Sequence, residues 1–141
     1  PVEALRLAAE LTVSSERDEM IRRAAMEWAL QDAVAAIEWA RQIPDVALRS
    51  QVLASEAIAW ADSAPESAAT LAVESLPSGR LLDDTVISIV QRWAQQQPAA
   101  AAAWVEQFPS GALRLTAAEN LLAQWSQTDA ERAQQWRSAN L

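Results

Sequence analysis

The chain has 141 residues, the size of one ordinary domain, and its 19 acidic residues against 11 arginines give a net charge of −8. It contains no histidine, cysteine or lysine, which removes the imidazole base, the thiol nucleophile, the Schiff-base amine and the soft metal ligands from its chemistry. The excess of acidic residues argues against a cationic surface that would bind nucleic acid. No apolar run reaches about eighteen residues, which argues against a membrane-spanning helix. We therefore expect no cofactor, no nucleic-acid partner and no membrane insertion.

Amphipathic helices follow one another along the whole chain. Apolar residues recur at the i, i+3, i+4 and i+7 positions, as in Ile21, Ala24, Ala25 and Trp28, and no stretch shows the alternation typical of a strand. The pattern predicts helices over residues 1–11, 14–30, 32–43, 45–61 and 65–76, then a helix after Gly79 that runs through Trp93, and helices over 98–108, 113–125 and 129–140.

Tryptophan and proline recur at a fixed period. Four first-column tryptophans lie 32, 33 and 32 residues apart, and a second-column residue follows each of them by eleven positions. A stop proline then ends the helix, whereas Pro1, Pro65 and Pro98 stand where a helix begins. The first column is Trp28, Trp60, Trp93 and Trp125; the second is Leu7, Trp39, Leu71, Trp104 and Trp136; the stop prolines are Pro44, Pro77 and Pro109.

Small and capping residues occupy further fixed positions in the repeat. An alanine stands three residues before every second-column residue, where its small side chain would let a neighbouring backbone approach closely. These alanines are Ala4, Ala36, Ala68, Ala101 and Ala133. Capping residue types at the turns predict helix N-caps at Ser14 or Ser15, Asp32, Asp45, Ser78, Ser110 and Asp129.

Two helices in every 32 or 33 residues indicate a solenoid of αα-hairpins. The pattern W-A-x-x-x-P-x-x-A-x-x-W, followed by a stop proline, resembles the tetratricopeptide class of helical repeats in period and architecture over essentially the whole chain. It also looks like tandem repeats of uncharacterised bacterial proteins. We expect an all-α, right-handed superhelix of about four and a half repeats, forming one domain over residues 1–141, either complete or a piece of a longer array. The resemblance implies an adaptor or scaffold whose concave surface is made by the longer helices.

The aromatic, basic and acidic positions each allow a functional and a structural interpretation. The tryptophans could form a stacking platform, but the exchange of Trp for Leu71 within one column favours packing. An arginine column could contact anions through bidentate hydrogen bonds, although its place in the first turn of a helix, beside acids, favours salt bridges. Adjacent acids such as Asp83 and Asp84 point about 100° apart on a helix, which favours solvated surface. The arginines of the column are Arg17, Arg49 and Arg114.

A polar stripe runs along the longer helices at positions nine, five and one residues before each first-column tryptophan. Steps of four keep each triplet on one helix face, and stacked repeats would align the triplets into a ribbon. The ribbon is either an ordinary wet face or a groove for an extended peptide. The predicted contact residues are Arg23, Ser55, Ser88, Arg92 and Asn120, and the stripe also contains Glu19, Glu27, Gln51, Ala59, Asp84, Thr116 and Gln124.

The sequence favours an interaction protein over an enzyme. The leading hypothesis is a non-catalytic protein or peptide interaction module, an adaptor or scaffold, that uses the polar stripe. The alternative is a spacer or self-assembling segment that joins chains through the helix of residues 1–11. In that helix Leu5, Leu7 and Leu11 remain apolar, whereas the last helix turns polar at Arg137 and Asn140. An enzyme would require a deep pocket that joins a carboxylate of strongly raised pKa to an arginine.

Overall fold

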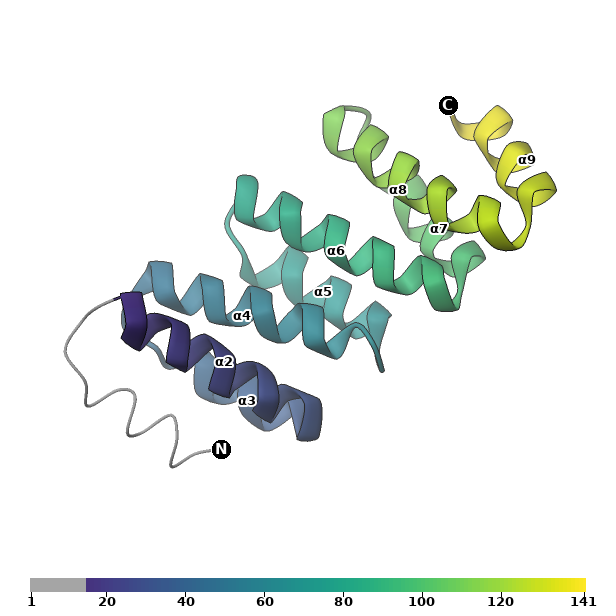
Figure 1. Ribbon diagram of the computed structural model, residues 1–141. Coiled ribbons are helices and arrows are strands. Elements are labelled where there is room, and N and C mark those ends of the chain that lie inside the picture. The colour runs from purple at the N-terminus through teal and green to yellow at the C-terminus, as the bar shows by residue number, and fades with distance from the viewer. Residues whose placement is uncertain (1–14) are drawn as a thin grey trace. The chain divides into compact units, whose positions relative to one another are not determined.

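The computed structural model describes residues 15–141, and every regular element in this range is a helix (Figure 1). The predicted helix over residues 1–11, with Leu5, Leu7 and Leu11, lies outside the described residues. Among the described helices, none is long and apolar enough to cross a bilayer. The eight described helices are α2 (Ser15–Gln31), α3 (Ala33–Ala40), α4 (Val46–Trp60), α5 (Pro65–Ser75), α6 (Arg80–Gln96), α7 (Pro98–Glu106), α8 (Ala112–Thr128) and α9 (Ala130–Asn140).

The predicted helix boundaries hold to within a few residues, with two differences of note. The helix predicted to reach Ile43 ends at Ala40. Its chain continues through turns in which the N–H groups of Gln42 and Ile43 bond to carbonyls three residues earlier, a tighter winding that often finishes a helix. The helix predicted to end at residue 125 instead runs on to Thr128.

The chain divides into two compact units, and the boundary between them in the sequence falls between Thr85 and Val86, inside α6. In the first unit a longer helix alternates with a shorter one. Helix α2 contacts both α3, its hairpin neighbour, and α4, the next longer helix. Helix α4 in turn contacts α3 and α5. Each longer helix of this unit therefore packs against its hairpin partner, and α2 and α4 pack against each other.

The second unit contains the remainder of α6 and helices α7, α8 and α9. Helix α8 contacts α7 before it and α9 after it. Its hairpin with α9 is closed by a break at Asp129, whose side chain accepts a hydrogen bond from the N–H of Arg132 at 3.1 Å. The second unit thus repeats the alternation of longer and shorter helices that the first unit shows.

Proline and aspartate start the helices where the sequence predicts them. Pro65 and Pro98 occupy the first turn of α5 and α7, where a missing N–H breaks no helical bond. Asp32 and Asp45 cap α3 and α4; the Asp45 carboxylate accepts from the N–H groups of Ala47 and Leu48. These side chains satisfy donors that would otherwise have no partner in the first turn.

The predicted serine caps at Ser78 and Ser110 are wrong, because a glycine directly precedes each helix. Helix α8 has Gly111 as its N-cap and no side-chain cap, and α6 begins immediately after Gly79. Gly79 and Gly111 have φ values of 148° and 156°, a region that side chains rarely adopt. The backbone conformation of these turns therefore selects glycine over a capping serine.

The repeat columns form the core. The second-helix alanines Ala36, Ala68, Ala101 and Ala133 are at most 1% exposed, which agrees with their predicted role as points of close helix approach. None of the seven tryptophans is exposed, and Trp93, Trp125 and Trp136 are buried. Rings of the two columns pack together, with centroids 6.4 Å apart for Trp28–Trp39 and 5.8 Å for Trp93–Trp104. Tryptophan is therefore a packing residue here.

Candidate functional site

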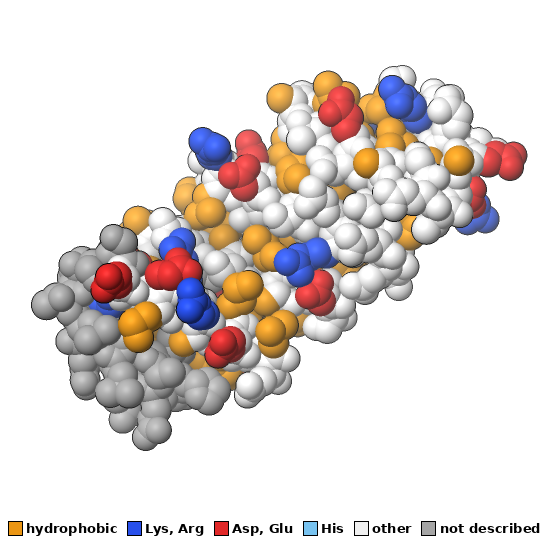
Figure 2. All heavy atoms as spheres, in the orientation of Figure 1, with side chains coloured by type: hydrophobic (Ala, Val, Ile, Leu, Met, Phe, Trp, Pro, Cys, Tyr) orange, Lys and Arg blue, Asp and Glu red, His pale blue; other side chains and the backbone are white. Residues whose placement is uncertain are grey.

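The polar stripe of the first unit lies on the solvent side of α2 and α4. Arg23 has a side chain that is 73% exposed and pairs with Glu19 at 3.8 Å, and Figure 2 shows arginine and acidic side chains intermixed over α2. Ser55 is half-buried on α4. Ala59 departs from the predicted pattern, because it is 4% exposed and packs with Ala29 and Ala36. The stripe is therefore polar and accessible at two of its three positions on α4.

The stripe of the second unit is partly engaged in contacts between helices. Ser88 and Arg92 are half-buried on α6. Asn120 of α8 accepts a hydrogen bond from Gln91 Nε2 of α6 at 2.6 Å, and it donates to the Thr116 carbonyl at 2.9 Å. At Asn120 the stripe thus serves helix packing as well as the surface.

The three column arginines lie in different surroundings. Arg17 pairs with Asp18 at 3.3 Å, and it lines a cavity with Trp39 and Asp45, whose carboxylate caps α4. Arg49 donates from Nη1 to the Ile43 carbonyl at 3.0 Å and so braces the turn between α3 and α4. Arg114 is half-buried near the end of the chain. Arg49 does not line the cavity that Arg17 lines, so this cavity presents one of the column arginines.

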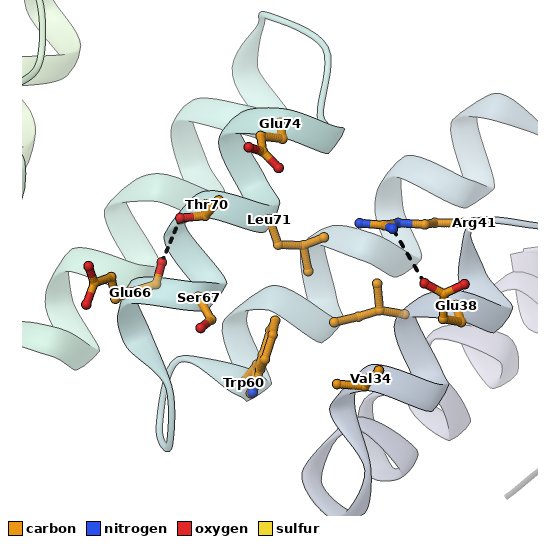
Figure 3. Close-up of a pocket in the computed structure, with 10 residues that line it drawn as sticks. Val34, Glu38, Arg41, Trp60, Glu66, Ser67, Thr70, Leu71 and Glu74 are labelled. Carbon is orange, nitrogen blue, oxygen red and sulfur yellow. Dashed lines mark hydrogen bonds and ion pairs between the residues drawn. The ribbon is translucent and has the colours of Figure 1, made fainter.

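A groove that the sequence pattern does not predict lies between α3 and α5 (Figure 3). It lies wholly within the first unit and has a volume of about 490 Å³. Helix α3 and its C-cap form one wall, α5 forms the other, and Trp60 at the end of α4 lies between them. Its lining residues are Val34, Ile37, Glu38, Arg41, Trp60, Glu66, Ser67, Thr70, Leu71 and Glu74.

The groove has an apolar floor and an acidic rim. Ile37 and Leu71 are buried and Trp60 is half-buried, so carbon atoms line the space between the two helices. At the rim, Glu66 and Glu74 are exposed on α5 and make no ion pair among residues 15–141.

The opposite wall of the groove carries an ion pair. Arg41 lies 3.6 Å from Glu38, and both side chains are more than half exposed. The groove therefore presents three carboxylates and one guanidinium that already faces a carboxylate.

The groove is open because Leu71 takes the place of a tryptophan. In the second unit Trp136 of α9 donates from its indole N–H to a carboxylate oxygen of Glu106 on α7 at 2.7 Å, so an indole joins two successive shorter helices. The equivalent residues of the first unit, at the same separation of 30 positions, are Leu71 and Arg41. Leucine is smaller than tryptophan and has no donor, so α5 cannot bridge to α3 in this way.

Trp60 also lacks the aromatic neighbour that Trp28 and Trp93 of its column have. Trp28 and Trp93 each pack against a second-column tryptophan, whereas the residue eleven positions after Trp60 is Leu71. Trp60 instead lines the groove. The sequence contained this signal, since the Leu71 exchange is visible in the column. By itself, however, the column indicates only that either residue type packs at this position.

A buried glutamate is the one strongly perturbed acid among the described residues. Glu56 of α4 is 0% exposed, and neither carboxyl oxygen has a hydrogen-bond partner. Desolvation by burial raises its pKa from 4.5 to about 8. The equivalent positions, four residues before each first-column tryptophan, hold Ala24, Ile89 and Leu121. Glu56 therefore occupies an apolar column.

Glu56 has the raised pKa that a catalytic acid would need, but such an acid must also contact its substrate. Glu56 lines neither the groove nor the cavity beside Arg17, and with no exposed surface its carboxyl does not reach a solute in this conformation. Among the described residues there is also no cluster of three acidic side chains that could hold a metal ion.

Compared with known proteins, the chain matches no family model, no curated protein and no solved structure. No relative therefore supplies a functional residue, and the arguments below depend on the geometry of this chain.

Proposed function

We propose that the chain is a non-catalytic interaction module, built as a right-handed αα-hairpin solenoid of about four and a half repeats, that binds protein or peptide partners. The register of tryptophan, proline and alanine supports this architecture. So do the contacts within each unit, where shorter helices pack on longer ones and α2 packs on α4. The polar stripe centred on Arg23, Ser55, Ser88, Arg92 and Asn120 is the contact surface.

One observation supports the stripe most directly. On α2 the stripe residues Glu19, Arg23 and Glu27 are exposed, whereas Ile21 and Ala25 between them are at most 3% exposed. The apolar face of α2 therefore packs into the core, whereas its polar face is exposed to solvent. Because α4 packs beside α2, the half-buried Ser55 extends the same kind of surface onto the next helix.

Charge reversal on the stripe tests this proposal. Proteins retained by the immobilised 141-residue chain are identified, and their affinities are measured by isothermal titration with the Arg23→Glu and Arg92→Glu variants. Arg132→Glu is the matched control, because Arg132 is 71% exposed and pairs with Asp129 as Arg23 pairs with Glu19, but lies off the stripe. We expect binding to weaken in the stripe variants and not in the control. Unchanged affinity in both stripe variants would remove the stripe as the contact surface.

A further inference from the structure

The floor of the groove between α3 and α5 has the size and chemistry to accept one apolar side chain. Ile37, Trp60 and Leu71 line it, and in the second unit the corresponding space between successive shorter helices is spanned by the indole of Trp136. A side chain from outside can therefore supply contacts that the fold supplies itself elsewhere. Figure 3 shows Leu71 and Trp60 directed into this space from α5 and α4.

The rim of the groove selects the charge of its occupant. Glu66 and Glu74 have no cationic partner among the described residues, and Arg41 is already opposite Glu38. The chain as a whole carries a net charge of −8. An acidic segment, including a second copy of this chain, would therefore be repelled, whereas an arginine or lysine side chain would be attracted. The half-buried Trp60 indole adds a ring that a cation can approach.

The spacing of the rim acids defines the shape of the occupant. Glu66 and Glu74 are eight residues apart on α5, which places them about 12 Å apart along the helix axis. In an extended peptide, residues i, i+2 and i+4 point to the same side, and residues i and i+4 are about 13 Å apart. Two basic side chains four positions apart therefore match the two acids, with the middle residue over the floor.

We propose that the groove between α3 and α5 binds a short basic peptide segment in extended conformation. Its central aliphatic side chain packs on Ile37, Trp60 and Leu71, and its flanking arginine or lysine side chains pair with Glu66 and Glu74. The inference rests on the proposed interaction role but uses a different surface, formed by the shorter helices. If the polar stripe binds no partner, the proposal for the groove is unaffected. If the groove does not bind the peptide, the proposal for the stripe is likewise unaffected.

A synthetic peptide tests the groove directly. The probe is acetyl-Arg-Ala-Leu-Ala-Arg-amide, titrated into the ¹⁵N-labelled 141-residue chain and followed by amide chemical shifts. Two control peptides change one property each: one has glutamate in place of both arginines, and the other has serine in place of leucine. We expect saturable shifts on α3 and α5 with the probe, and at least a fivefold weaker affinity for either control peptide.

Two variants of the chain separate the groove from general charge effects. Leu71→Trp restores the residue type that three other second-column positions carry and fills the floor, so we expect probe affinity to fall at least tenfold. The double variant Glu66→Gln, Glu74→Gln should weaken the probe about fivefold, as expected for two exposed ion pairs. The matched control Glu119→Gln, Glu131→Gln changes the net charge equally on exposed residues of the second unit and should leave probe affinity unchanged.

Each outcome of the titrations either supports or overturns the proposed binding of a basic peptide in the groove. Saturable shifts on α3 and α5 that both groove variants reduce support the proposal. It is overturned if the probe does not bind, if its shifts fall on the polar stripe, or if the glutamate peptide binds equally well. Equal weakening by the groove and control charge variants would also overturn it, because the attraction would then be unspecific. Circular dichroism of each variant establishes that its helices are intact.

Discussion

Replacing Glu56 should stabilise the first unit and remove much of the pH dependence of its stability. Glu56 is fully buried on α4 without a hydrogen-bond partner, in a column where the corresponding residues Ile89 and Leu121 are 0% exposed. Glu56→Leu restores the apolar residue type of the column. Glu56→Gln keeps the shape of the side chain and removes only its ionisation. The two variants thus separate the cost of charge from the cost of polarity.

The size of the effect follows from the pKa of Glu56, which burial raises from 4.5 to about 8. Below pH 4.5 the carboxyl is protonated in both folded and unfolded chains, so ionisation costs no stability. As the pH rises towards 8, only the unfolded chain ionises, and the free energy of unfolding falls by about 1.4 kcal/mol per pH unit. The loss reaches about 3 kcal/mol at pH 7 and changes no further once the pH exceeds the folded pKa.

Urea unfolding followed by circular dichroism at several pH values between 4.5 and 8 measures this loss. The difference in unfolding free energy between Glu56→Gln and the parent chain isolates this one group, because the other 18 acidic residues are common to both chains. We expect the difference to be small at pH 4.5 and to grow towards pH 8. Glu56→Leu should be the more stable of the two variants throughout, since it also removes the unpaired polar group.

A difference that stays constant with pH would refute this reasoning. It would mean that Glu56 titrates alike in the folded and unfolded chains, and hence that its carboxyl reaches water or a partner in the folded state. Carbon-detected titration of the Glu56 carboxyl checks the same point directly, because a midpoint near 4.5 instead of near 8 would contradict the burial of the group.

Three smaller changes test the turns and the bridge between helices. Gly111→Ala should cost about 1–3 kcal/mol in urea unfolding, because its φ of 156° is strained for alanine although no atom lies within 4 Å of the added carbon; a neutral result would contradict the strain. Asp45→Ala should cost about 1 kcal/mol through the lost N-cap, whereas Asp45→Asn, which retains the accepting oxygen, should cost clearly less. Trp136→Phe should cost about 1–2 kcal/mol through the lost hydrogen bond and lost contacts. Glu106→Gln preserves an acceptor for that indole and should have little effect, whereas a Trp136→Phe variant as stable as the parent chain would contradict the contribution of this hydrogen bond.

The sequence alone determined the succession of helices and most of their ends. These features depend on local chemistry, because a proline that lacks an N–H or an aspartate that caps an N-terminus acts within one turn of its own helix. Pro65, Pro98 and Asp45 therefore lie where the pattern predicts. The repeat register also predicted burial, since an alanine such as Ala101 recurs at one position only if a neighbouring helix approaches there.

Only the tertiary structure decided which departures from the repeat matter. Leu71 and Glu56 were both visible as exceptions in their columns, but a column does not show whether a smaller side chain is compensated by its neighbours or whether a polar one finds a partner. The packing of α3 against α4 and of α4 against α5 leaves a groove at Leu71 and no partner for Glu56. Cavities and desolvation arise from atoms far apart in the chain, whereas the periodicity of a sequence reports only the position of each residue within its own helix.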